Sequence, residues 1–432
     1  MADLLIHGGA VYGEKGWLDP GYVVIEEDQI REVSPGSPPR QLVEESETVL
    51  DADKKALVPG LTNAHTHLSQ TFMRGLAGGR SLLDWLKEVI WPLQREISPE
   101  ELYLAALVGL VENLRCGAIS LTNHHKITAS EAHTDAVCQA ADRVGLRFTL
   151  ARSWADLGSG AEQPEKILAD LDRLQVQWQH HPRISIANGP LALWRCSAEM
   201  LQRSHQLITD YSGLTHFHVA ETRDEVRMSV EAYDRRPVHW LEEIEVLDGS
   251  TELVHAVWVN EQEIEQLAEH QAVVVHCPVS NAVLGSGIAP IPEMLQAGIP
   301  VRLGTDGPAS NDNQDLWETA KSALMIARIS QQDATLLPPE QVLRLALAGK
   351  KLTAGTPADV VIVNLDHPGV VPVQDLSSAL ILGAQGGAVE TVVVAGEILL
   401  LDGEVKVLDE ADLLDQARGA ITSLKKRAGL EA

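Results

Sequence analysis

The chain has 432 residues, and its hydrophobic fraction of 45% and charged fraction of 22% are those of a soluble globular protein. This composition excludes a fibrous or intrinsically disordered chain. Lysine and arginine total 34 against 61 aspartate and glutamate residues, which gives a formal net charge of −27 at pH 7. Such a charge repels phosphate backbones and anionic lipids, so it disfavours nucleic-acid and membrane-surface roles. A strongly anionic substrate would need a local basic patch.

The N-terminal segment and the cysteines indicate where the protein works. The N-terminus carries an acid early, at Asp3, and lacks a long apolar core, so we do not expect a secretory signal. No window reaches the ~18 apolar residues of a membrane span. The four cysteines are scattered and form no Cys-x-x-Cys pair. We therefore expect a cytoplasmic protein in which cysteine is not a metal ligand.

Short strand-like runs open the chain, within residues 1–57, where apolar stretches are separated by Gly, Pro and Asp. From 58 to 349, strand-like runs alternate with helix-length amphipathic segments, such as 99–115, 130–144, 164–177 and 260–270. This alternation predicts a parallel sheet with crossover helices, and its length suits a closed eight-stranded barrel. Strand-like runs return in 350–408, and a closing helix is expected within 409–432.

The predicted fold class is therefore α/β. We expect a (β/α)8 TIM-type barrel over residues 58–349 and a small composite β-sandwich domain built from both chain ends, 1–57 and 350–408. The two flanks are paired because neither holds enough apolar residues for a core of its own. The C-terminal helix, 409–432, follows the sandwich.

Six of the 16 histidines lie at or near the end of a strand-like run, just before a loop. Alternate residues of a strand face the same side, so His65 and His67 point together, and so do His216 and His218. In a barrel, all such strand ends meet at the C-terminal mouth. The groups that would meet there are His65, His67, His216, His218, Glu221, His255, His276 and Asp306.

Three imidazoles and one carboxylate form a donor set suited to zinc or another divalent metal, with a water completing the shell. The predicted ligands are His65, His67, His218 and Asp306, with Glu221 and His255 unliganded beside the water. The Asp306 carboxylate follows a buried strand, where a nearby cation would remove the cost of burying it. Any one of these residues could be an ordinary core or loop group. The ordered set favours a catalytic metal site.

A resemblance to a known family rests on four segments: Pro59-Gly-Leu-Thr-Asn-Ala-His-Thr-His, His216-Phe-His-Val-Ala-Glu, His276-Cys-Pro-Val-Ser-Asn and Gly304-Thr-Asp-Gly-Pro-Ala-Ser-Asn-Asp. With them the chain resembles the amidohydrolase superfamily over nearly its whole length. Within it, the chain is similar to the branch that holds methylthioadenosine/S-adenosylhomocysteine deaminases, 8-oxoguanine deaminases and s-triazine hydrolases. The resemblance implies a distorted barrel with a composite β-sandwich and commonly a homodimer or higher homo-oligomer.

The resemblance also implies one divalent metal ion, with zinc favoured and iron as the alternative. Members with two metals generally carry a carboxylated lysine at the end of the fourth strand, and the stretch 184–194 has no lysine. In the expected reaction, metal-bound hydroxide attacks the ring carbon that bears an exocyclic amine. Glu221 would carry a proton to the adjacent ring nitrogen, and His255 would hold the water. Asp306 would ligate the metal and help move a proton to the departing ammonia.

The expected substrate contacts depart in part from the nucleoside-acting members. Those enzymes tend to have Glu where this chain has Gln94 and His where it has Leu191, whereas Arg152 matches an arginine that they use on the substrate. Asn123-His124-His125 instead resembles the Asp-His-His of the 8-oxoguanine and triazine enzymes. The candidate substrate-binding residues are Gln94, Arg152, Trp85, Trp91, Trp194, His276, His124 and His125. Packing at the barrel mouth is the alternative for the tryptophans, His124 and His125, and orienting another group is the alternative for His276.

We therefore expect a hydrolase of carbon–nitrogen bonds other than peptide bonds, of the cyclic amidine deaminase type, with purine- or adenosine-type substrates favoured. One alternative is an s-triazine-type hydrolase that displaces an alkylamine or halide, because the same groups serve either departure. Another class of protein, a catalytically silent barrel used as a binding or assembly module, would typically have lost some of the ligands present here. The expected partners are a small-molecule substrate and further copies of the chain, with no nucleic acid and no membrane.

Overall fold

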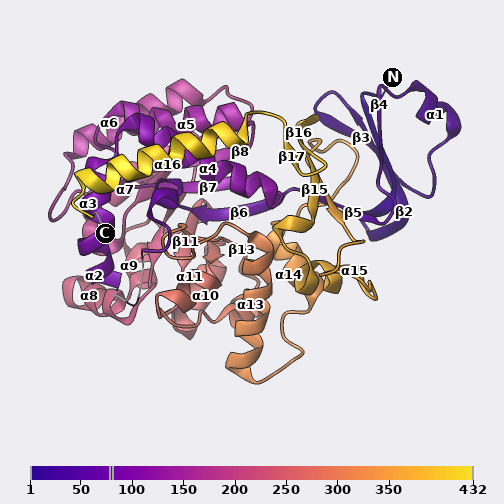
Figure 1. Ribbon diagram of the computed structural model, residues 1–432. Coiled ribbons are helices and arrows are strands. Elements are labelled where there is room, and N and C mark those ends of the chain that lie inside the picture. The colour runs from indigo at the N-terminus through magenta and orange to yellow at the C-terminus, as the bar shows by residue number, and fades with distance from the viewer. Residues whose placement is uncertain (1, 77–78, 80–81, 431–432) are drawn as a thin grey trace.

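The computed structural model describes residues 2–76, 79 and 82–430. Within them, eight parallel strands form a nearly closed barrel in the order β13-β12-β11-β10-β9-β8-β7-β6 (Figure 1). The strands are β6 (Leu61–Thr66), β7 (Ala118–His125), β8 (Arg147–Trp154), β9 (Ile184–Pro190), β10 (Thr215–Val219), β11 (Thr251–His255), β12 (Val273–His276) and β13 (Val301–Leu303). The Asp306 amide donates to the His65 carbonyl (2.9 Å), which joins the last strand to the first. The predicted barrel is confirmed.

Helices surround the outside of the barrel in Figure 1. Their starts follow local capping signals: α4 begins after Ser98 and α10 after Asn260, each in a capping box with a glutamate at the third helical position. The barrel helices are α4 (Pro99–Arg115), α5 (Glu131–Val144), α6 (Pro164–Trp178), α7 (Ala198–Asp210), α8 (Arg223–Tyr233), α9 (Pro237–Glu243), α10 (Glu261–Glu269), α11 (Pro278–Val283), α12 (Ile291–Gln296), α13 (Leu316–Gln331) and α14 (Pro339–Ala346).

Both chain ends contribute to a separate mixed sheet beside the barrel (Figure 1). Strand β5 from the first part pairs antiparallel with β14 from the second, with Pro59 opposite Val360 and Val58 opposite Val361. The strands are β1 (Leu4–Gly13), β2 (Gly16–Glu26), β3 (Gln29–Pro35), β4 (Thr48–Asp51), β5 (Lys55–Pro59), β14 (Val360–Asn364), β15 (Val389–Val394), β16 (Glu397–Leu401) and β17 (Glu404–Val405). The predicted joining of the two flanks is confirmed.

The last helix, α16 (Glu410–Arg427), runs across the outside of the barrel (Figure 1). An ion pair ties each of its ends to α4: Arg115 binds Glu410 (2.6 Å) and Arg427 binds Glu101 (2.5 Å). Among the described residues, no helix combines the length and the apolarity needed to cross a bilayer.

Short helical segments fill the remaining connections. Between β6 and α4 the chain forms η1 (Leu68–Met73), α2 (Leu82–Trp85), the π-helical turn η2 (Leu86–Ile90) and α3 (Trp91–Glu96). The others are α1 (Arg40–Glu45), η3 (Leu193–Arg195), α15 (Leu376–Ser378), η4 (Ala379–Gly383) and η5 (Gly386–Ala388). The first group carries three of the predicted substrate contacts, Trp85, Trp91 and Gln94.

Candidate metal centre

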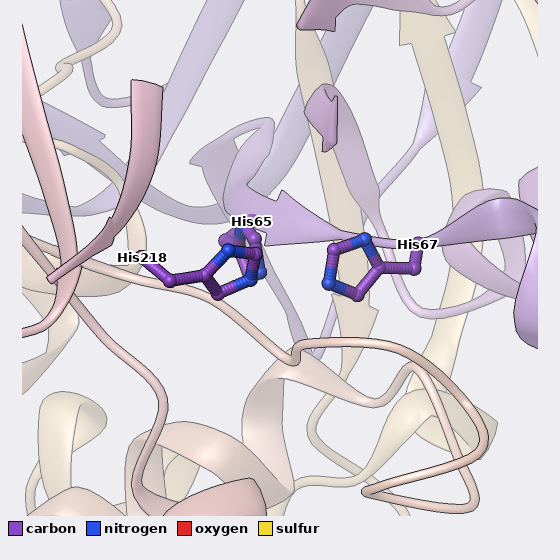
Figure 2. Close-up of side chains that lie close together, drawn as sticks. All are labelled: His65, His67 and His218. Atoms are coloured by element: carbon purple, nitrogen blue, oxygen red, sulfur yellow. The ribbon is translucent and has the colours of Figure 1, made fainter. Parts of the chain in front are cut away.

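Three buried histidine side chains converge at the C-terminal end of the barrel. His65 and His67 come from the end of β6, and His218 comes from β10. One ring nitrogen of each lies within 4.8 Å of those of the other two, an arrangement that can hold a metal ion. Figure 2 shows the three rings turned toward one another. The predicted meeting of His65, His67 and His218 at the barrel mouth is therefore confirmed.

Hydrogen bonds at the far side of two of the rings decide which nitrogen is free. His67 Nδ1 donates to the carbonyl of His124 (2.7 Å), and His218 Nδ1 donates to the carbonyl of Leu191 (3.0 Å). A carbonyl oxygen can only accept, so the proton of each neutral ring lies on Nδ1. The Nε2 lone pairs of both rings therefore remain available to a metal.

The third ring, that of His65, is oriented by a chain of buried polar groups. His65 Nδ1 lies 2.8 Å from His216 Nε2, and His216 Nδ1 lies 2.8 Å from a carboxylate oxygen of Glu252. Arg302 forms an ion pair with the other oxygen of Glu252. Burial raises the pKa of Glu252, but the hydrogen bond with His216 and the charge of Arg302 outweigh it and lower the pKa. The ionised carboxylate accepts from His216, His216 in turn accepts from His65, and His65 Nε2 is left free.

The Asp306 carboxylate lies beside two of these histidines. Its Oδ1 lies 3.4 Å from His65 Nε2 and 3.2 Å from His67 Nε2, while its Oδ2 accepts from Ser280 (2.5 Å) and Ser310 (2.9 Å). Although burial raises the pKa of this carboxyl, the neighbouring His65 and His67 rings hold it well below its usual range. Asp306 has a φ of +60°, a left-handed conformation that aspartate tolerates better than most residues.

These residues fit a divalent metal. The Nε2 atom of His65 is buried and has no hydrogen-bond partner among the described residues. Burial lowers the pKa of His67 and holds the pKa values of His65 and His218 well below their usual range, so all three rings are neutral ligands at pH 7. Three neutral imidazole nitrogens and one carboxylate oxygen are a donor set that zinc takes in catalytic sites.

Two further polar groups lie beside the donor set. Glu221 follows β10, and its Oε1 accepts from Ser286 (2.9 Å), while its Oε2 lies 3.7 Å from His255 Nε2. His255 Nδ1 donates to the side-chain oxygen of Asn281 (2.8 Å), which directs its Nε2 toward Glu221. Glu225 accepts from the Glu221 amide (2.8 Å), and burial together with the Glu221 charge raises the pKa of Glu225 to about 7.

Comparison with known proteins agrees with this geometry. The profile of the Amidohydrolase family matches residues 56–399. The chain belongs to the amidohydrolase family. It is 34% identical to the 5-methylthioadenosine/S-adenosylhomocysteine deaminase of Syntrophomonas wolfei, over 94% of this chain and 95% of that one. It is 35% identical to the 5'-deoxyadenosine deaminase of Methanothermobacter thermautotrophicus, over 98% of both chains.

Solved structures of similar fold contain zinc. An adenosine deaminase from Xanthomonas campestris with bound zinc superimposes on this amidohydrolase with a TM-score of 0.92 at 28% identity, covering 98% of this chain and 99% of that one. The atrazine chlorohydrolase TrzN from Arthrobacter aurescens, in complex with zinc, gives a TM-score of 0.89 at 25% identity, covering 97% and 100%.

The amidohydrolase brings some of the predicted substrate contacts to the metal centre. The His124 ring lies against the triad of His65, His67 and His218. Its centroid is 4.7 Å from the ring centroid of His218 and 5.5 Å from that of His67. Trp194 lines a small cavity together with His218. His276 is buried at the end of β12, and burial lowers its pKa to about 3.

Three predicted contacts lie in the connection between β6 and α4. Trp85 is buried, and Trp91 is half-buried against the core. Gln94 Nε2 is buried and lacks a hydrogen-bond partner among the described residues. These three residues remain candidates for contact with substrate.

Arg152 and His125 are not brought to the metal centre. They are paired across β7 and β8, and Arg152 binds Asp170 of the outer helix α6 (2.9 Å) and Glu162 (2.7 Å). His124 faces the barrel interior, so the neighbouring position in each strand faces the helices instead. Arg152 therefore belongs to an ion-pair network, and its contact with substrate stays a prediction. His125 is buried, and burial lowers its pKa to about 3; its contact with substrate stays a prediction.

The sequence did not assign roles to several residues around this centre. His216 and Glu252 support His65, Asn281 orients His255, and Ser286 holds Glu221. The sequence did indicate one property of His216: it lies two residues before His218 in a strand, so the two side chains share a face. Glu252 carried no local signal, because its partner lies on another strand.

Proposed function

We propose that this amidohydrolase is a zinc-dependent deaminase that removes the exocyclic amine of a purine-type nitrogen heterocycle. The main support is the convergence of three histidine Nε2 lone pairs and the Asp306 carboxylate. Two groups suited to proton transfer, Glu221 and His255, lie beside them. Similarity to deaminases of adenosine analogues supports the substrate class, and the zinc-bound neighbours support the metal.

The metal and the side chains have separate tasks in this proposal. His65, His67, His218 and Asp306 would hold a divalent ion, which would lower the pKa of a bound water to about 7 and so supply a nucleophile at neutral pH. The reaction consumes one water, breaks the bond between the ring carbon and the amine nitrogen, and releases ammonia.

Glu221 is placed to move the protons. Its Oε1 is held by the Ser286 hydroxyl, and its Oε2 lies 3.7 Å from His255 Nε2. Glu221 takes a proton from the attacking water and gives it to the ring nitrogen next to the reacting carbon, which makes that carbon electrophilic. His255, oriented by Asn281, holds the attacking oxygen in place. Asp306 then helps to pass a proton to the departing amine.

Ammonia release tests this proposal. Zinc-loaded protein is assayed with adenosine-type, oxopurine, pterin and triazine compounds, and we expect ammonia from at least one purine-type compound. Treatment with a chelator should abolish release, and added zinc should restore it. Absence of ammonia from every aminated ring would contradict deamination.

Glu221→Gln tests the role of the carboxylate. We expect the variant to retain zinc at the wild-type stoichiometry and to lose ~10²–10⁴-fold in kcat, because an amide cannot transfer the proton. Zinc content by elemental analysis and the Tm are the controls for folding. Wild-type turnover in a zinc-loaded variant would remove Glu221 from this role.

Triazine-type hydrolysis is a second candidate function. The His124 ring against the triad, within the sequence Asn123-His124-His125, favours it, as does the structural similarity to TrzN. The same assay separates the two candidates, because a triazine hydrolase would release alkylamine or halide. A homo-oligomeric state and a cytoplasmic location remain predictions for either candidate.

A further inference from the structure

Lys126 lies at the mouth of the barrel and has no part in the chemistry described above. It directly follows β7 (Ala118–His125), at the end of the barrel where the metal ligands converge. If the alternation of β7 is continued by one residue, Lys126 falls on the same side as His124, whose ring contacts His218. The residue is partly exposed, so a molecule in the mouth can reach it.

The ammonium of Lys126 has no fixed partner. Among the described parts of the chain, no hydrogen bond or ion pair ends on it. Its charge nevertheless acts on groups of the metal centre: it lowers the pKa of His67 and of His218, where it is the largest effect after burial. Burial lowers the pKa of Lys126 itself, and the nearby carboxylates of Asp306, Glu221 and Glu225 oppose that shift.

The nearby carboxylates do not need Lys126 as a partner. Asp306 accepts from Ser280 and Ser310, Glu221 accepts from Ser286, and Glu225 accepts from a backbone amide. An ammonium has three donors and a large desolvation cost, so a lysine left without an acceptor beside satisfied acids is poised for an acceptor that arrives from outside.

We propose that Lys126 is a specificity-determining residue, whose ammonium binds a negatively charged oxygen, such as a carboxylate, carried by the ring of the substrate. The inference rests on the proposed function and narrows its substrate class. The group must lie on the ring, because Lys126 is close to the residues that surround the reacting carbon. A protein with a net charge of −27 also needs a local positive charge to admit an anionic substrate.

Binding of a matched pair of ligands tests the proposal. Pterin and pterin-6-carboxylate differ by one carboxylate, and their intrinsic fluorescence reports binding to the zinc-loaded protein without turnover. We expect wild-type protein to prefer the carboxylate. Lys126→Met should weaken binding of the carboxylate ~10–100-fold and that of pterin less than ~3-fold, because only the charged group loses its partner. Lys126→Arg should retain the preference.

Lys350→Met is the matched control. Lys350 donates to the hydroxyl of Ser120 (2.8 Å), near the opposite end of β7, and its removal should leave both affinities unchanged. The proposal is overturned if wild-type protein does not prefer the carboxylate, or if Lys126→Met affects both ligands equally or neither. Preferential binding without ammonia release would support the role of Lys126 and count against deamination, so the two failures are distinguishable.

Discussion

The hydrogen-bonded chain from His65 through His216 to Glu252 leads to a prediction about zinc affinity. Glu252, which is not a metal ligand, should control how tightly the protein binds zinc. Glu252 is 1% exposed and serves two donors, His216 Nδ1 at 2.8 Å and the Arg302 guanidinium. A carboxylate can accept from both. Glu252→Gln replaces one acceptor oxygen by an NH₂ group, so one of the two donors must lose its acceptor and face another donor.

The magnitude follows from which donor is lost. If the amide oxygen stays on His216, the tautomer of His65 is preserved, and the Arg302 guanidinium loses its acceptor and faces the NH₂ group. If the NH₂ group faces His216, that ring changes tautomer and presents a proton to His65 Nδ1, which disturbs a metal ligand. Loss of a hydrogen bond to a charged group costs about 1.5–3 kcal/mol. Loss of an outer partner of a metal ligand typically lowers metal affinity 10–100-fold, about 1.4–2.7 kcal/mol, in agreement.

Zinc affinity, measured by competition with a chromophoric chelator, gives the readout. We expect Glu252→Gln to bind zinc ~10–100-fold more weakly than wild type. Glu263→Gln is the matched control, because Glu263 is fully buried and paired with Arg236 (2.8 Å) away from the metal centre. It should lower the Tm and leave the zinc affinity unchanged. Equal zinc affinity in Glu252→Gln and wild type would refute the reasoning.

Two further predictions concern packing and protonation. In Gly304→Ala the new Cβ would lie 2.8 Å from His65 Cβ and 3.0 Å from His65 N, so we expect reduced zinc content by elemental analysis; Gly249→Ala, with its nearest neighbour at 3.9 Å, should keep the wild-type content. Burial lowers the pKa of His125 to about 3 in the folded protein, whereas the usual pKa of about 6.5 applies to the unfolded chain. Between these two values only the unfolded chain binds a proton at this ring, so the free energy of unfolding falls as the pH falls. When the pH is lowered from 6 to 5, the free energy of unfolding of metal-free His125→Asn, measured by urea denaturation, should fall by about 1 kcal/mol less than that of metal-free wild type. Identical pH dependences of the two proteins would contradict this.

Strand periodicity sufficed to predict which histidines share a strand face. The spacings His65-x-His67 and His216-x-His218 place each pair on one strand face whatever the rest of the chain does, because the alternation is local. The amphipathic segments 99–115 and 260–270 likewise correspond to helices α4 and α10, which the structure shows beginning after the capping residues Ser98 and Asn260. The ordered strand ends then sufficed to predict a barrel with its donors at one mouth.

The same local reasoning could not decide what lies beside each donor. Glu252 supports His216 because the register of β10 and β11 places the two residues directly opposite each other. Arg152 lies opposite His125 and faces α6, although its sequence context matches that of a substrate-binding arginine. A shift of one residue in a strand exchanges interior and exterior, so this outcome depends on the register alone.

The sequence by itself determined the alternating strands and helices, the pairing of the two flanks into one sheet, and the residue types that can hold a metal. These follow from periodicity, composition and donor chemistry, which are properties of short segments. Only the tertiary structure decided that His216 supports His65, that Arg152 faces outward and that Lys126 has no partner among the residues that the structure describes. Contacts between strands far apart in the chain depend on register and barrel closure, which no short segment contains.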